Sequence, residues 1–161
     1  MRWLPCCTFV YVAVFTGTSA RYAAGQTSTV DSSAVASAIA SAIRPRIPLG
    51  GANHGAKMDE RPSSQFAAAP WNRLVGRALS ALDTTLVAPD PTPYTLGVNV
   101  VSVVAAGDSL VARVAFTQCR DTARGRMFGG SSYDYVFRRA DPSWRYETER
   151  VRGTGDGRCD E

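Results

Sequence analysis

The chain has 161 residues, a length typical of a single domain, and it is basic, with 18 Lys and Arg against 14 Asp and Glu. Nearly all of the positive charge is arginine, since Lys57 is the one lysine, and these arginines are spread among acidic residues. Because nucleic-acid-binding proteins more often gather basic residues on one element, the distribution argues against nucleic acid as a partner and indicates a solvated surface.

The first 20 residues have the layout of a secretory signal peptide. Arg2 is the only charge before Arg21, an apolar run fills residues 9–15, and small residues precede a cleavage point after Ala20. Cleavage after Gly25 is nearly as good on the same grounds. We therefore expect a protein that is secreted or exported to a bacterial periplasm, since the arginine bias is typical of GC-rich codon usage.

The alternative is that this segment stays as a membrane anchor. Residues 3–20 are uncharged and approach the roughly 20 residues of a spanning helix, but their distal end is polar and no basic cluster follows it. Cleavage remains the better interpretation, and it leaves no further membrane span. Residues 21–30 are then a flexible N-terminus, and residues 31–161 form one domain.

Two helices are predicted ahead of the strands. Asp31 caps the first, over residues 32–44, whose narrow, alanine-rich apolar face is typical of a helix at the surface of a core. Residues 45–70 are rich in Pro and Gly and predict a loop. A wide apolar stripe then runs from Trp71 to Leu86 and predicts a helix that must be buried against a sheet.

The rest of the chain predicts strands. Apolar and alternating runs cover residues 96–104, 110–117, 133–138 and 144–151, with turn residues between them. The fold class is therefore α+β, with N-terminal helices packed on a four-stranded antiparallel meander sheet, one face of which the Trp71 helix covers.

Two cysteines remain after signal removal, Cys119 and Cys159, and in an oxidising compartment we expect them to form a disulfide. A closed loop of about 40 residues would stabilise the fold by roughly 4 kcal/mol through the unfolded state. A metal site lacks ligands, because His54 is the only histidine and stands far from both cysteines in sequence. We expect neither a metal nor a cofactor.

The helices followed by long strands, with Tyr133, Tyr135, Val136 and Phe137 before a turn and Trp144, Arg145 and Tyr146 after it, resemble the nuclear-transport-factor-2-like superfamily over about residues 71–152. The resemblance implies a curved sheet wrapped around helices. It also implies a cone whose mouth holds a ligand or, in some members, a catalytic Asp and His. No histidine stands in the resembling region of this chain.

The aromatic residues of the last strands are the first candidate binding site. Tyr133, Tyr135, Trp144 and Tyr146 could line an apolar pocket, with hydroxyls that orient a ligand, although alternating aromatic residues more often pack in a core. A second candidate is the segment 120–130, in which Arg120, Arg124 and Arg126 flank an apolar Met127-Phe128 tip. An ordinary hairpin connection is the simpler interpretation of that segment.

Catalysis has one weak candidate, Asp134 between two tyrosines, and a cross-strand ion pair with an arginine is the better interpretation of it. Ser131 and Ser132 lack a nucleophile elbow, so hydrolase chemistry is unsupported. The preferred hypothesis is an exported, non-enzymatic module that binds a small ligand or a protein. The alternatives are a cone-fold enzyme that uses Asp134 with tyrosine hydroxyls, and a structural envelope protein.

Overall fold

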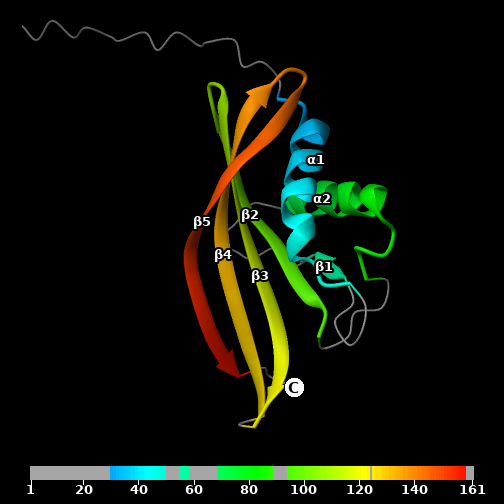
Figure 1. Cartoon of the computed structure of the whole chain (residues 1–161), viewed down its shortest axis with the longest axis vertical. Coiled ribbons are helices and arrows are strands. Elements are labelled where there is room, and N and C mark those ends of the chain that lie inside the picture. Colours follow the sequence, from blue (N-terminus) through cyan, green and yellow to red (C-terminus); the bar gives the residue numbers. More distant parts are fainter. Residues whose placement is uncertain (1–29, 50–54, 59–68, 89–93, 124, 159–161) are drawn as a thin grey trace, which may run out of the picture.

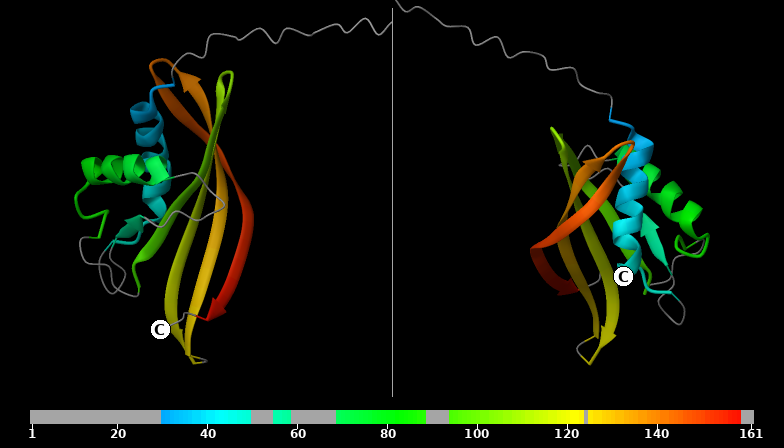
Figure 2. Two further views of the ribbon diagram at one scale, coloured as in Figure 1. Left: turned by 180° about the vertical axis from the view of Figure 1, so that it is seen from behind. Right: turned by 45° about the horizontal axis from the view of Figure 1, so that its top comes forward.

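The structure is a computed structural model that describes residues 30–49, 55–58, 69–88, 94–123 and 125–158. Two helices pack on one side of an open five-stranded sheet in the order β1-β2-β3-β4-β5 (Figures 1 and 2). The helical elements are α1 (Ser32–Ile43), a 3-10 turn η1 (Arg44–Arg46) and α2 (Ala69–Leu82). The strands are β1 (Ala56–Met58), β2 (Leu96–Ala106), β3 (Ser109–Thr122), β4 (Gly125–Ala140) and β5 (Ser143–Arg158).

The α+β class and the meander of the four long strands are confirmed, but the count of four strands is wrong. β1 adds a fifth strand, parallel to β2, inside the segment predicted to be a loop. Three residues are too few to show a period of two in the sequence. Gly55, at φ +57°, makes the strand possible, because a Cβ there would lie 2.8 Å from the Leu86 carbonyl oxygen.

α1 forms where the sequence predicts it, and its start is capped as expected. The Asp31 carboxylate accepts a hydrogen bond from the Ser33 amide at 2.9 Å. The helix packs through this one narrow face, since Val35, Ile39 and Ile43 are fully buried while the serines on the opposite side stay exposed. α1 contacts α2 on one side and β5 on the other. Its small alanine side chains let both neighbours approach closely, so the narrow stripe is fully part of the buried core.

α2 follows the predicted stripe as far as Leu82 and then stops. Asp83 accepts hydrogen bonds from the Thr85 amide and hydroxyl at 2.9 and 2.8 Å, which closes a turn after the helix. Leu86 is still fully buried, but it lies beyond the helix, where its carbonyl oxygen accepts the Ala56 amide at 2.7 Å. The last apolar residue of the stripe therefore belongs to the connection that holds β1.

The strands are longer than predicted, and two segments expected to be irregular belong to them. Residues 120–122 and 125–130 pair within β3 and β4, and residues 153–158 near the end of the chain pair with β4 from Met127 to Ser132. Their glycines have low strand propensity. Pairing between long neighbouring strands outweighs this propensity, so the sheet extends past the helices (Figure 1).

The two faces of the sheet differ in what covers them. One, here called the helix face, carries Leu110, Val114 and Phe116 of β3 and Tyr135 and Phe137 of β4, all buried in one cluster with α1 and α2. The opposite outer face has no helix over it within the described residues (Figure 2). The candidate site residues divide between these faces.

Candidate ligand-binding groove

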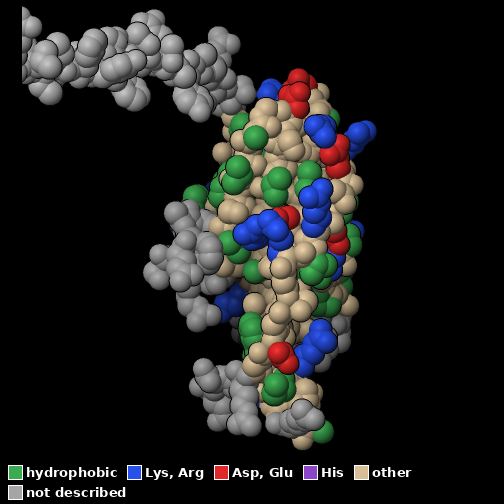
Figure 3. Space-filling view, turned by 90° about the vertical axis from the view of Figure 1, so that its left-hand side faces the viewer, with side chains coloured by type: hydrophobic (Ala, Val, Ile, Leu, Met, Phe, Trp, Pro, Cys, Tyr) green, Lys and Arg blue, Asp and Glu red, His purple; other side chains and the backbone are tan. Residues whose placement is uncertain are grey.

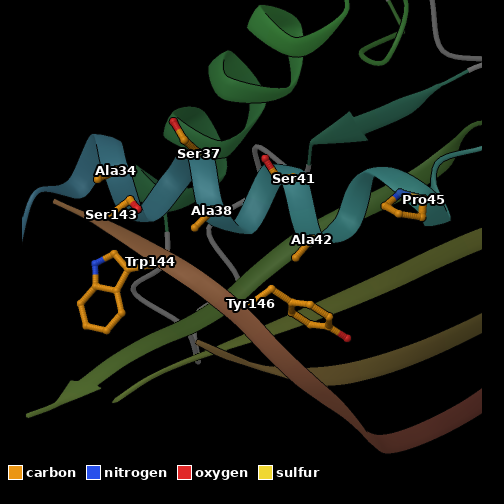
Figure 4. Close-up of a pocket in the computed structure, with 9 residues that line it drawn as sticks. All are labelled: Ala34, Ser37, Ala38, Ser41, Ala42, Pro45, Ser143, Trp144 and Tyr146. Atoms are coloured by element: carbon orange, nitrogen blue, oxygen red, sulfur yellow. The ribbon is translucent and has the colours of Figure 1, made fainter. Parts of the chain in front are cut away.

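A groove of about 460 Å³ runs between α1 and the start of β5. Ala34, Ala38 and Ala42 line it from the helix, and Trp144 and Tyr146 line it from the strand (Figure 4). The alanines recur every four residues and so share one helix face, which leaves room above β5. Trp144 lies toward the Ala34 end and Tyr146 beneath Ala42. Tyr146 is 44% exposed, so the groove is open to solvent.

Tyr146 continues into a row of aromatic rings on the helix face. Its ring centroid lies 6.2 Å from that of Tyr135 and 6.1 Å from that of Phe137. Tyr135 lies 6.2 Å from Tyr133, which in turn meets Phe116 edge to face at 5.8 Å. These distances are typical of packed aromatic pairs. Of the predicted binding residues, the structure therefore brings together Tyr133, Tyr135, Trp144 and Tyr146.

Arg46, at the end of η1, covers this row from the side of α1. Its guanidinium carbon lies 3.9 Å from the centroid of the Tyr133 ring, a cation–π contact, and the same group forms an ion pair with Glu149 of β5. The Arg46 and Glu149 side chains remain 33% and 31% exposed. A charged pair thus stands beside the row of aromatic rings, within reach of solvent.

The Tyr135 hydroxyl lies beneath this pair. Tyr135 is fully buried, and within the described part of the chain its hydroxyl makes no hydrogen bond of good geometry, although the Arg46 guanidinium is near enough to interact with it. Burial raises the pKa of Tyr135 well above its ordinary value, and Glu149 and Tyr133 add to this effect while Arg46 opposes it. The hydroxyl therefore stays protonated near neutral pH and is available as a donor. Buried polar groups without a partner are uncommon in native proteins.

Asp134 points the other way, to the outer face, where it joins two arginines. It accepts bonds from Arg113 of β3 at 2.8 and 3.3 Å and from Arg152 of β5 at 2.5 Å. The hydrogen bond from Arg113 is the main cause of the lowered pKa of Asp134. Burial acts in the opposite direction, but Arg113 and Arg152 together outweigh it. The predicted cross-strand arginine partner is confirmed. A carboxylate so held is a poor proton donor, and the neighbouring tyrosine rings lie on the opposite face.

We expect Asp134→Asn to lower the free energy of unfolding at pH 7 by about 1 kcal/mol, since the arginines it leaves are half exposed. The lowered pKa means that Asp134 stabilises the fold above its unfolded pKa of about 3.9. This contribution is lost as pH falls through the folded pKa. Urea titrations from pH 7 to pH 2.5 should therefore show the variant and the wild type converging in acid. Asp156→Asn, at an exposed carboxylate with no ion pair among the described residues, is the control and should change stability little at any pH.

Arg120 and Arg126 lie apart from the groove, at the far end of the sheet. Arg120 donates to the Gln118 side chain at 3.1 Å, and Gln118 in turn donates to the Tyr94 carbonyl oxygen. A depression of about 560 Å³ lies there between Arg120, Met127 and Asp156. Arg126 is exposed beside the turn, and Arg124 lies outside the described residues.

Several predictions fall wholly or partly outside the described residues. These are the signal peptide, the flexible N-terminus, His54 and Cys159. Cys119 lies within β3 opposite Phe128 of β4, and Phe128 in turn pairs with Gly157 of β5. β5 therefore ends two strands away from Cys119, at the residue that precedes Cys159 in sequence. The Cys119–Cys159 disulfide stays a prediction. Among the described residues there is no cluster of three metal-ligating side chains and no helix long and apolar enough to cross a membrane.

Sequence reasoning missed the ion pair of Arg46 and Glu149, which lies beside the row of aromatic rings. Alternation from Tyr146 would place Thr148 and Arg150 on the helix face. A β-bulge between Tyr146 and Thr148 shifts this alternation by one residue, so that Glu149 pairs with Tyr135 instead. The Arg-Pro-Arg sequence after α1 is the one signal for Arg46, because a proline there ends the helix and fixes the turn.

Comparison with protein-family models, with curated proteins and with solved structures found no match for this chain.

Proposed function

We propose that this protein is an exported, non-enzymatic module that binds a small ligand in the groove between α1 and β5. The observation that carries the proposal is the open groove itself, walled by Trp144 and Tyr146, with the Tyr135 ring packed against that of Tyr146. Binding pockets for small molecules are mostly apolar and aromatic, with a few polar groups that fix orientation. This groove has that composition.

The residues around the groove define the ligand's chemistry. Its walls of alanine and aromatic rings suit a flat, apolar or aromatic body. The polar groups in its lining are the hydroxyls of Ser37, Ser41 and Ser143, which can donate and accept hydrogen bonds. Because none of the described residues that line the groove is charged, the site favours a ligand with a neutral polar group, such as a carbonyl oxygen, over a strongly charged one.

The enzyme alternative receives less support. It requires Asp134 and the tyrosine hydroxyls to converge on one substrate, whereas Asp134 lies on the outer face with both oxygens bound by arginines. General acid–base chemistry requires a group within reach of the proton it transfers. Membership of the nuclear-transport-factor-2-like superfamily is itself proposed. It is compatible with a binding role but is not evidence for that role.

The test is binding of an uncharged aromatic fluorescent probe to the protein that begins at Arg21. Trp144→Ala and Tyr146→Ala should each weaken binding by about tenfold, since a lost aromatic contact of this size corresponds to roughly 1.4 kcal/mol. Titration followed by fluorescence gives the dissociation constants. Trp71→Phe is the matched control, because Trp71 packs against the core from α2 and does not line the groove.

Circular dichroism on each variant separates lost binding from lost folding. If the Trp144 and Tyr146 variants fold and bind the probe as tightly as the wild type, the groove is not the binding site. If the Trp71 variant loses binding to the same extent while its fold is intact, the site lies elsewhere on the molecule.

A further inference from the structure

The sheet ends on a long open edge. β5 is the last strand in the sheet order and has 16 residues, and within the described residues no strand pairs with its free side. The backbone amide and carbonyl groups on such an edge are a template for an added strand. Binding of an extended peptide along a sheet edge is a common mode of protein recognition.

The outer face of this edge carries an alternating row of charges. Arg113 of β3 pairs in register with Asp134 of β4, which pairs with Arg150 of β5. The Asp134 oxygens bond to Arg113 and Arg152, so Arg150 has no carboxylate partner among the described residues. Figure 3 shows the side of the molecule that carries β5, with arginine side chains flanking an acidic one. A strand added beside β5 would continue this row, and a negative charge would be favourable at its residue next to Arg150.

A second row leads to the same expectation. Arg138 of β4 stands directly opposite Arg145 of β5, an unfavourable pairing of like charges. Arg138 is compensated by Glu147 at 3.2 Å, whereas no ion pair involves Arg145 in the described part of the chain. The other glutamate of β5, Glu149, is bound to Arg46 on the helix face. The edge is therefore left with two uncompensated arginines.

The spacing of these arginines sets the length of a matching ligand. Arg145 and Arg150 pair with Arg138 and Asp134, four positions apart on β4, because the bulge at Glu147 absorbs one residue of β5. Four strand positions span about 13 Å. We propose that the β5 edge binds an extended acidic polypeptide segment as a sixth strand, with two carboxylates four residues apart that face Arg145 and Arg150.

A second copy of this chain fits the edge less well. Two β5 strands related by a twofold axis would present arginines to arginines on the outer face, since Glu147 and Glu149 are already bound within the chain. A nucleic acid or an anionic polymer matches the charge but not the row of backbone groups, which pairs only with another polypeptide. Charge and backbone together therefore select an acidic peptide.

The test uses the protein that begins at Arg21 and a synthetic peptide of alternating threonine and valine with two glutamates four positions apart. We expect the double variant R145Q/R150Q to weaken peptide binding by roughly tenfold, because it removes two cross-strand charge pairs. Fluorescence anisotropy measures the dissociation constants. The matched control is R73Q/R77Q, which removes the same charge from the exposed side of α2 and should bind as the wild type does. Hydrogen exchange should show new protection along β5.

Other results would overturn the proposal. Equal weakening by the two double variants, or equal binding of a peptide with glutamine in place of glutamate, would mean that local charge at the edge does not select the ligand. Competition by single-stranded DNA of the same charge would show attraction without strand pairing. A dimer in sedimentation experiments without peptide, lost on R145Q/R150Q substitution, would assign the edge to a second copy. None of these outcomes depends on the groove between α1 and β5.

Discussion

Ile39→Ala is expected to destabilise the protein by about 2–5 kcal/mol, the range for truncating a large aliphatic side chain in a closed core. Ile39 is fully buried at the middle of α1, among residues of α2 and the sheet. Loss of three carbon atoms there leaves a cavity that the surrounding strands cannot close without shifting. Urea unfolding followed by far-UV circular dichroism should show the midpoint falling while the slope stays constant.

Leu82→Ala is the matched control, since it removes as many carbon atoms from a side chain that is 49% exposed at the end of α2. It should cost less than about 1 kcal/mol, because surface substitutions seldom exceed this. A cost at Ile39 as small as that at Leu82 would mean that α1 is not an integral part of the core. The helix would then lie at the surface, as its narrow stripe alone predicts.

Ile39 marks where sequence patterns predicted the fold and where they did not. Period and capping predicted both helices, because Asp31 and the spacing of Val35, Ile39 and Ile43 are local signals. The depth of α1 is a tertiary property. It depends on how closely α2 and β5 approach a helix with alanine on its flanks, which no local pattern records.

The sheet shows the same division between local and tertiary information. Alternation predicted the middle of each long strand, where side chains pack against the helices. The glycine-rich ends at Gly130, Gly153 and Gly155 have no apolar period, and β1 is too short for one. These segments are strands because neighbouring strands satisfy their backbone hydrogen bonds. Pairing of this kind depends on residues distant in sequence.

The candidate site could be predicted in part. The aromatic residues were visible as a set, because Tyr133 and Tyr135 alternate along one strand and Trp144 and Tyr146 along the next. Arg46 and Glu149 were not, because a bulge reverses the expected side of Glu149 and a turn brings Arg46 across about 100 residues of sequence. The charged pair beside the aromatic row is thus set by tertiary structure.

Tyr135→Phe is expected to raise the free energy of unfolding by about 1–3 kcal/mol, the cost of burying a polar group that has no partner. The ring contacts with Tyr133 and Tyr146 remain, so packing should change little. Thermal and urea unfolding near pH 7 measure the difference. At this pH the raised pKa of Tyr135 keeps the wild-type hydroxyl neutral, so the substitution removes a dipole and no charge.

Because the Tyr135 hydroxyl is fully buried and does not line the groove, the same substitution should leave binding of the fluorescent probe unchanged. Tyr146→Phe is the control, since that hydroxyl belongs to a side chain 44% exposed and can be solvated. It should alter stability by less than about 0.5 kcal/mol. A Tyr135→Phe variant that is less stable than the wild type would show that the hydroxyl has a partner in the free protein. A stabilised variant with unchanged binding would show that the hydroxyl is a buried polar group that costs stability and does not contact the ligand.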